Sequence, residues 1–481
     1  MAKITAVIDI GSNSVRMAVF ERTSRLGFHL LREVKSRARI SENAYKNGGV
    51  LQEAAMRRSE QALSEFAHIA KGYDARKVLV VATSAVRDAP NKADFLRRVR
   101  AVSGLQIRVI DGKEEARLGG VAAANLLGVR NGVTIDIGGG STELALISEG
   151  KIASCVSFDL GTVRLKELFF DGEMNIDGAK RFIQSRLEAL GEEFANSLII
   201  GIGGTLRALA TVIMRESGYQ FDALHGFRFA IGSLEKIVRS SDAELSKMGF
   251  KNDRLDVIRE GVLIFASVAA KIGAKQAITS GVGVREGAFL TDLLRNENDS
   301  LPKGAQPSVI CLLDRFAMKP KQIHWNAHCA AQFFDAMREP LGLDERHRMA
   351  LITAAKLLTI GERVDPYHQQ STGATLVLNA LAYGFNHTER LLIAELVASS
   401  EKRRLQQPPN ENYAALLPSA KEIRALGTIL YLTKTLGASK TCPKLTLTLV
   451  GNELTISGAG YLARETLVGF KSPIDIKFFA K

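Results

Sequence analysis

The chain is poor in the features that mark a secreted protein, a membrane protein or an aromatic-rich binding protein. Its four cysteines are scattered without paired spacing, which argues against a disulfide framework. No apolar run reaches membrane-spanning length, and Asp9 interrupts the first one, so we expect neither a membrane helix nor an N-terminal signal peptide. Aromatic residues make up only 6% of the chain, which disfavours a stacking platform for nucleic acid. These absences predict a cytoplasmic protein.

The chain carries an excess of positive charge on an otherwise ordinary globular composition. Its 481 residues have a net charge of +13, with 46% apolar and 24% charged residues. Residues 301–481 contain 22 Lys and Arg against 15 Asp and Glu, which is about half of the excess. A basic surface attracts polyanions, but charge alone does not distinguish nucleic acid from polyphosphate, or either from a solvated surface without a partner.

Two stretches have nearly the same sequence, VIDIGSNSVRMAVF and TIDIGGGSTELALI. Each predicts an apolar strand, an acidic residue, a turn of small residues and a second apolar strand. Asp136 and Glu143 of the second stretch correspond to Asp9 and Arg16 of the first. Such a turn directs backbone N–H groups and hydroxyls to one spot, which suits phosphate oxygens, and an Asp among phosphates needs a hard cation such as Mg²⁺. We expect the two turns to face each other and to hold a phosphate chain.

The order of strands and helices after the first stretch is repeated after the second, which indicates an internal duplication. The alternation predicts an α/β protein whose mixed sheets are covered by helices. A linker rich in Pro and Gly at 302–307 precedes a helical region, and an alternating stretch around Gly451-Asn452 predicts a β-hairpin. The predicted domains are an N-terminal α/β lobe, a second α/β lobe and a mainly helical C-terminal domain with a β-hairpin tail, at residues 1–127, 128–298 and 299–481.

Four further motifs accompany the two stretches, in the order TSAVRDAPN, DGKEEARL, GIGGT and SGVGVREG. With these motifs, residues 4–295 resemble the exopolyphosphatase and guanosine pentaphosphate phosphohydrolase family, within the superfamily of sugar kinases, actin and Hsp70-type ATPases. The resemblance is weaker over the helical third. It implies two duplicated actin- or hexokinase-like lobes of ribonuclease H-like fold, with an active site in the cleft. It also implies Mg²⁺-dependent release of terminal phosphate from inorganic polyphosphate or from pppGpp, the latter a reaction of the stringent response.

The resemblance implies catalytic roles for three residues. Glu115 corresponds to the family's catalytic base, which would orient and deprotonate the attacking water. By residue type alone, Glu114 and Glu115 equally suit the first turn of a helix, where acidic side chains interact well with the helix dipole. Arg87 follows a buried strand, and its fork of donors suits a terminal phosphate, although an ordinary surface Arg would look the same in sequence. Glu143 would bind metal or the attacking water beside Asp136.

The remaining candidates are the residues of the two turns and their acidic neighbours. Glycine in such a turn is often only geometric, but two paired turns favour a phosphate cradle. The carboxylates could bind Mg²⁺ directly or hold metal-bound waters, since Mg²⁺ keeps several. The predicted metal site consists of Asp9, Asp136 and Glu143. The predicted substrate-binding residues are Gly11, Ser12, Asn13, Ser14, Gly138, Gly139, Gly140, Ser141 and Thr142.

The helical third departs from a pattern that some family members carry. There it resembles a metal phosphohydrolase module with adjacent His and Asp, whereas Thr359 and Ile360 stand at the corresponding positions of this chain. We therefore expect an HD-like domain without that metal pair. His324 and His328 are spaced for one face of a helix, which suits a metal. We nevertheless expect a structural or substrate-guiding role, in which basic residues lead a polyanion toward the cleft.

Two other functions are compatible with parts of the sequence. One is a phosphotransferase of the same superfamily, which would need a second substrate pocket. The other is a nucleotide-sensing or nucleic-acid-binding protein with an inactive cleft, which the basic charge favours and the intact carboxylates disfavour. The leading hypothesis is a phosphoanhydride hydrolase acting on inorganic polyphosphate or pppGpp. Under it, we expect neither nucleic acid nor a membrane as partner, and the family suggests a homodimer.

Overall fold

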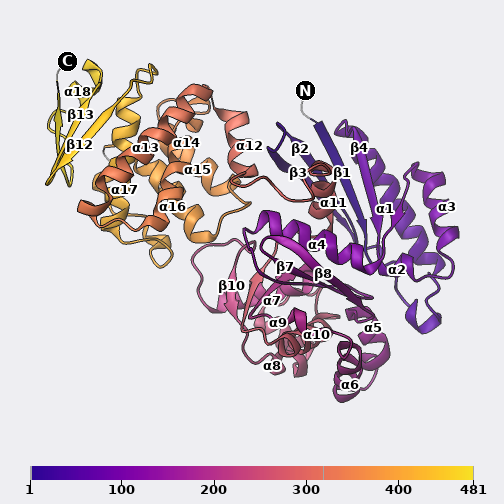
Figure 1. The fold of residues 1–481 in the computed structure, drawn as a ribbon. Coiled ribbons are helices and arrows are strands. Elements are labelled where there is room, and N and C mark those ends of the chain that lie inside the picture. The colour runs from indigo at the N-terminus through magenta and orange to yellow at the C-terminus, as the bar shows by residue number, and fades with distance from the viewer. Residues whose placement is uncertain (1–2, 318, 403, 480–481) are drawn as a thin grey trace. The chain divides into compact units, whose positions relative to one another are not determined.

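The computed structural model describes residues 3–317, 319–402 and 404–479. The chain forms two compact units: residues up to Arg22 together with Phe28–Ala305, and Thr23–Gly27 together with the chain from Gln306 onward. The first unit contains two mixed sheets with helices against them, and the second is mainly helical (Figure 1). The predicted fold class is confirmed, whereas the domain boundaries at 127 and 298 stay predictions. Within the described parts of the chain, no helix is both long and apolar enough to cross a membrane.

The first lobe is built around β1, an apolar strand that is buried on both faces. Val7, Ile8 and Ile10 are completely buried, because α1 and α3 cover one face and α11 packs against the strand as well. The sheet order is β3-β2-β1-β4-β5, with β1 antiparallel to β2 and parallel to β4. Its elements are β1 (Lys3–Ile10), β2 (Val15–Arg22), β3 (Phe28–Ser36), α1 (Glu53–Gly72), β4 (Lys77–Ala82), α2 (Ser84–Arg87), α3 (Lys92–Ser103) and β5 (Arg108–Val109).

The second lobe repeats the arrangement of the first. Its sheet has the order β8-β7-β6-β9-β11-β10, so that its first five strands match those of the first lobe, with β6 antiparallel to β7 and parallel to β9. This repeat confirms the predicted duplication, and β10 is an addition that the sequence pattern did not indicate. The strands are β6 (Gly132–Ile137), β7 (Thr142–Ser148), β8 (Lys151–Phe158), β9 (Leu198–Ile202), β10 (Arg228–Ala230) and β11 (Gln276–Thr279). The helices after β8 are α5 (Thr162–Leu165), α6 (Ile176–Leu187), α7 (Gly203–Glu216), α8 (Glu235–Arg239), α9 (Asp242–Met248) and α10 (Ile258–Ile272).

Two helices join the lobes. The α4 helix (Gly112–Leu126) precedes the predicted boundary at 127 but packs on β7 and β8 of the second sheet. The α11 helix (Val284–Leu293) follows the second sheet but packs on β1, where Phe289 stacks on Phe20 with ring centroids 4.5 Å apart. The two helices also contact each other closely, since a Cβ at Gly287 would lie 1.9 Å from the carbonyl oxygen of Leu118. Each lobe therefore depends on the other for part of its packing.

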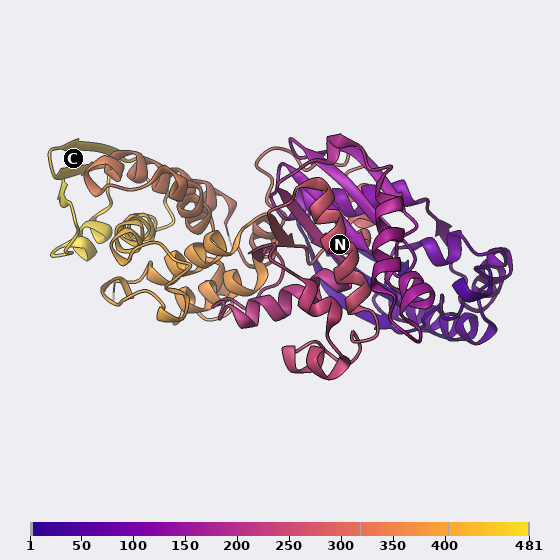
Figure 2. The same cartoon turned by 90° about the horizontal axis from the view of Figure 1, so that it is seen from below.

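The second unit consists of packed helices followed by a small sheet (Figure 1, Figure 2). The predicted hairpin forms, with Val450 paired to Glu453 across the turn. A third strand, β14, pairs in parallel with β13 and was not predicted from the sequence. The helices are α12 (Pro307–Phe316), α13 (Pro320–Leu341), α14 (Arg348–Lys356), α15 (Gln369–Ala380), α16 (His387–Ser399), α17 (Ala420–Leu436) and α18 (Tyr461–Leu467). The strands are β12 (Thr446–Val450), β13 (Glu453–Ser457) and β14 (Asp475–Phe478).

The region that corresponds to the metal module is part of the apolar core. Ile360 is completely buried among aliphatic side chains. His324 and His328 are exposed on α13, whereas His347 is buried and His368 lies 3.0 Å from an aspartate oxygen. In the described residues, no three His, Cys, Asp or Glu side chains are grouped to hold a metal ion.

Candidate active site

The two glycine-rich turns have the same backbone structure. The amide of Gly11 donates to the carbonyl of Ser14 at 3.2 Å, and the amide of Gly138 donates to the carbonyl of Ser141 at 2.9 Å. The strand registers also correspond, because Asp9 pairs with Arg16 as Asp136 pairs with Glu143. The expected equivalence of the two stretches is therefore found residue by residue.

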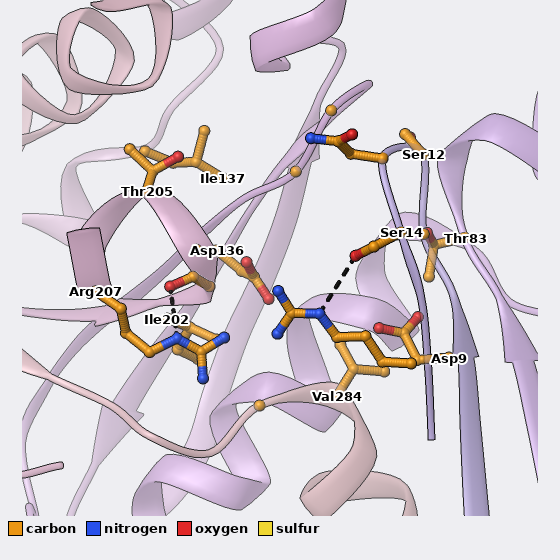
Figure 3. Close-up of a pocket in the computed structure, with 18 of the residues that line it drawn as sticks. Asp9, Ser12, Ser14, Thr83, Asp136, Ile137, Ile202, Thr205, Arg207 and Val284 are labelled. Carbon is orange, nitrogen blue, oxygen red and sulfur yellow. Dashed lines mark hydrogen bonds between the residues drawn. The ribbon is translucent and has the colours of Figure 1, made fainter. Parts of the chain in front are cut away.

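The turns face each other across the cleft of the first unit. A Cβ at Gly139 would lie 2.7 Å from the Cβ of Ser12, so only glycine allows this approach. The hydroxyl of Ser12 also lies 3.2 Å from that of Ser84 at the start of α2. Figure 3 shows Asp9 and Ser14 on one side of the pocket and Asp136 on the other. The structure therefore brings the two predicted cradles together.

Both lobes contribute to a cavity of about 140 Å³ between the turns. It is lined by polar and charged side chains and by the backbone of the GIGGT loop at the start of α7. The predicted residues in the lining are Asp9, Gly11, Ser12, Asn13, Ser14, Glu115, Asp136, Gly138 and Gly139. The predicted residues outside the lining, all in the described part of the chain, are Arg87, Gly140, Ser141, Thr142 and Glu143.

Three predicted carboxylates line this cavity and a fourth, Glu143, is buried just outside the lining; burial disfavours the charged forms of all four. Burial, opposed by nearby arginines, raises the pKa of Asp9 to about 6, and burial likewise raises the pKa of Asp136. Burial, together with the charge of Asp136, raises the pKa of Glu143 to about 8. The pKa of Glu115 lies well above its usual value because of burial and then the charge of Glu143. Such a group of mutually repelling carboxylates is typical of a functional site.

The carboxylates fit a cation that retains its water ligands. One oxygen each of Asp9 and Glu143 is buried without a hydrogen-bond partner, which favours an additional positive ligand. Three clustered His, Cys, Asp or Glu ligands do not occur among the residues that the structure describes. Mg²⁺ commonly binds through one or two carboxylates, substrate phosphates and waters, so this arrangement remains compatible with it. Asp9, Asp136 and Glu143 are the residues that would hold the ion.

The two neighbouring glutamates at the start of α4 lie in different environments. The helix begins after Asp111, whose side chain accepts from the amide of Glu114 at 2.7 Å. Glu114 is bound by Arg108 and Arg117 outside the cavity, at 2.5 and 2.7 Å. Glu115, on the next position, is 8% exposed and lines the cavity. The packing of α4 on the second sheet thus directs one carboxylate to a surface ion pair and the other to the cleft.

Arg87 does not line the cavity, but it contacts Glu115, which does. Its Nη1 atom lies 3.4 Å from Oε2 of Glu115, and its Nε atom lies 3.1 Å from Oδ1 of Asp88. The guanidinium is mostly buried at the end of α2. In this arrangement the arginine contacts the predicted base, whereas its predicted contact with a terminal phosphate stays a prediction.

Four arginines line the cavity without having been singled out as substrate-binding residues from the sequence. They come from β2, α7, the segment before α10 and α11, and they are Arg16, Arg207, Arg254 and Arg285. Arg285 is 6% exposed, pairs with Glu33 at 2.7 Å, and has a buried Nη1 atom without a hydrogen-bond partner. The motif SGVGVREG contains Arg285, but the sequence does not show whether its side chain faces the cavity or the surface. Burial and then Arg16 lower the pKa of Arg207 to about 10, as expected for cations brought together.

A second cavity of about 470 Å³ adjoins the first and shares three of these arginines. Lys35 of β3 also lines it, and burial followed by Arg254 lowers the pKa of Lys35 to about 8. The cations of the first cavity therefore continue into the second, which also contains Glu33 and Asp253. A row of cations that extends away from the carboxylates would suit an extended anion.

Comparison with known proteins agrees with the family resemblance of the sequence motifs. Residues 18–296 match the model of the Ppx/GppA phosphatase family. The Aquifex aeolicus member of that family is 28% identical over 62% of this chain and 99% of its own, with a TM-score of 0.52. An exopolyphosphatase from Cytophaga hutchinsonii shares the fold, at 23% identity over 60% of this chain and 98% of its own, with a TM-score of 0.56. With more than half of its length matched, the chain belongs to the Ppx/GppA phosphatase family.

Proposed function

We propose that the protein is a phosphoanhydride hydrolase that releases terminal orthophosphate from inorganic polyphosphate, hydrolyses pppGpp to ppGpp, or does both. The observation that carries this proposal is Glu115, a buried carboxylate that faces the paired turns and contacts Arg87 at 3.4 Å. Hydrolysis requires a held phosphate, charge neutralisation and an oriented water. The turns, the arginines and Glu115 meet these three requirements in one cavity.

In the proposed reaction the turns hold the terminal phosphate through backbone amides and the hydroxyls of Ser12 and Ser14. Glu115 accepts a proton from the attacking water, and its raised pKa makes it a stronger base than an ordinary glutamate once it is ionised. Arg87 keeps the ionised form of Glu115 oriented. Mg²⁺ bound at Asp9, Asp136 and Glu143 would supply positive charge that offsets the charge of the phosphate oxygens.

The principal test is Glu115→Gln, with Glu114→Gln as its matched control. The first variant removes the base from the cavity, whereas the second removes a neighbouring carboxylate that is ion-paired outside it. We expect Glu115→Gln to lower kcat for orthophosphate release by about 10³-fold, within the range for loss of a general base. Glu114→Gln should stay within a few-fold of the unmodified protein. Wild-type turnover in Glu115→Gln would remove this residue from the mechanism.

Side-by-side kinetics on long polyphosphate and on pppGpp, in the presence of Mg²⁺, would rank the two substrates. Release of free phosphate without any acceptor would separate a hydrolase from a phosphotransferase. We also propose the homodimer that the family suggests, and light scattering of the purified full chain tests it.

A further inference from the structure

Ser84 lines the cavity, and a tyrosine from the first lobe lies beside it, against the turn of the second lobe. Ser84 belongs to the lining, whereas Tyr45 and Gly140, both in the described chain, do not. A Cβ at Gly140 would lie 2.0 Å from the hydroxyl oxygen of Tyr45 and 2.8 Å from that of Ser84. Tyr45 and Ser84 thus both lie against Gly140, and the three residues form a wall. Ser84 begins the short helix α2 that ends at Arg87, and Arg87 contacts Glu115 at 3.4 Å, so the wall lies near the predicted base.

The hydroxyl of Tyr45 is buried beside the hydroxyl of Ser12. It has no hydrogen-bond partner at normal distance among the described residues. The ring instead lies under the guanidinium of Arg164, which is 4.7 Å from the ring centroid. Arg164 also donates to the carbonyl of Gly140 at 3.0 Å. The second lobe therefore holds the ring in place against its own phosphate cradle.

The segment that carries Tyr45 is fastened to the second lobe on both sides of the ring. Glu167 accepts hydrogen bonds from the backbone amides of Asn43 and Lys46, at 3.2 and 3.1 Å. The side chain of Lys46 pairs with Asp171 at 2.6 Å. Glu167 and Asp171 of the second lobe thus hold this short segment of the first lobe, and with it Tyr45, in place.

We propose that Tyr45 closes the end of the phosphate cavity beyond Glu115, so that only the end of a phosphate chain can reach the base and cleavage is confined to the terminal phosphate. This inference rests on the proposed hydrolase function. In an in-line displacement, the attacking water and the leaving group lie on opposite sides of the phosphorus. The water occupies the closed side at Glu115, and the shortened chain leaves toward the cavity shared by Arg16 and Arg207.

The step is balanced with water as the only co-reactant. The oxygen of water forms a bond to the terminal phosphorus while the bond from that phosphorus to the bridging oxygen breaks. The proton from water passes to Glu115, and the electron pair leaves on the shortened chain. An internal phosphorus in the same position would need chain on both sides, and in the proposed arrangement Tyr45 blocks the side beyond Glu115.

The test compares linear polyphosphate with polyphosphate whose two ends are blocked as phosphate esters. Product size is followed by gel electrophoresis and ³¹P NMR for the wild type and three variants. Tyr45→Ala opens the wall, Tyr45→Phe keeps the ring but loses the unpaired hydroxyl, and Tyr73→Ala removes a tyrosine packed elsewhere on the core of the same lobe. Because the hydroxyl has no partner, we expect Tyr45→Phe to unfold at a temperature no lower than the wild type.

We expect the wild type, Tyr45→Phe and Tyr73→Ala to release only orthophosphate and to leave the end-blocked chain intact. Tyr45→Ala should cut the end-blocked chain into shorter fragments, at a rate at least ten-fold above the wild type. If Tyr45→Ala is active on linear chains but leaves end-blocked chains intact, or if the wild type already cuts them, Tyr45 does not restrict cleavage. If the wild type releases no phosphate from any polyphosphate or pppGpp, the proposed function itself fails. Loss of all activity in Tyr45→Ala with full activity in Tyr45→Phe would show that the ring supports turnover without selecting chain ends.

Discussion

The two lobes carry the same turn in the same register but place different chemistry beside it. In the first lobe the strand partner of Asp9 is Arg16, whereas in the second the strand partner of Asp136 is Glu143. Arg16 lines the cavity, and its Nε atom donates to the hydroxyl of Ser14 at 3.3 Å. Glu143 is buried outside the lining and accepts from Ser157 at 2.8 Å.

Under the proposed function, this difference would let a duplicated element hold an anion from two sides without two identical sites. The shared turn would supply backbone amides on both sides of a phosphate. The exchanged residue would make one side a contact for anions and the other a place for a cation or a water. Four predictions test whether the two sides differ in this way.

The strongest test of the comparison is to neutralise the exchanged residue in each lobe. We expect Glu143→Gln to lower kcat by about 10²-fold with little change in KM, because it removes a charge needed at the reacting phosphorus. Arg16→Gln should raise KM by about ten-fold with a smaller change in kcat, because it removes a charged contact to the chain. Steady-state kinetics on polyphosphate measure both. The same split between kcat and KM in the two variants would mean that the lobes do not differ in role.

The second test concerns the acidic residue that both turns retain. Asp136→Ala should raise the Mg²⁺ concentration for half-maximal activity by about ten-fold or more, since a carboxylate that holds the ion or its waters is lost. A titration of activity with Mg²⁺ measures this, and Asp177→Ala, an exposed aspartate on α6, is the matched control. An unchanged titration in Asp136→Ala would place the ion elsewhere.

The third test follows stability with pH in the presence of a chelator. The pKa of Glu143 is about 8 in the folded protein, against an ordinary value of 4.5. Between these values the folded state keeps a proton that the unfolded state has lost, so the free energy of unfolding falls as pH rises through this window. Glu143→Gln has no such group, and its Tm should therefore rise relative to the wild type between pH 5 and pH 8. One pKa unit corresponds to about 1.4 kcal/mol, so at roughly 2–4 °C per kcal/mol we expect a rise on the order of ten degrees.

A constant Tm difference between Glu143→Gln and the wild type at all pH values would contradict this raised pKa. Because a bound cation favours the ionised carboxylate, adding Mg²⁺ should reduce the difference at pH 8.

The smallest expected effect comes from Ser157, which donates to Glu143 and so stabilises its ionised form. Ser157→Ala should raise the pKa of Glu143 by up to about one unit, which corresponds to the loss of one charge-assisted hydrogen bond. The rising limb of the profile of kcat against pH should move to higher pH by the same amount. Ser157→Thr keeps the hydroxyl and serves as the control. A lower kcat at every pH without a shift would assign Ser157 only a packing role.

The duplicated strands, the turns and most helices could be predicted because their signals are local. The helical region after the linker and the hairpin that turns at Gly451 form as predicted, since apolar periodicity and turn chemistry act over a few residues. The strands β10 and β14 were missed because each is short and is formed by pairing with a distant strand. The predicted site was largely brought together, yet Arg207 and Arg254 were missed because nothing local distinguishes them from other surface arginines.

The sequence by itself determined the twin turns, their acidic residues and the absence of a His-Asp pair at Thr359 and Ile360, because each depends on residue type and spacing within a few positions. Only the tertiary structure decided that Glu115 enters the cleft while Glu114 does not, and that Tyr45 lies against Gly140. These outcomes depend on which helix face is covered and on where the opposite lobe lies, and neither is encoded in the neighbouring residues. Burial then raises the pKa values of the enclosed carboxylates, which is a property of the closed site rather than of any one residue.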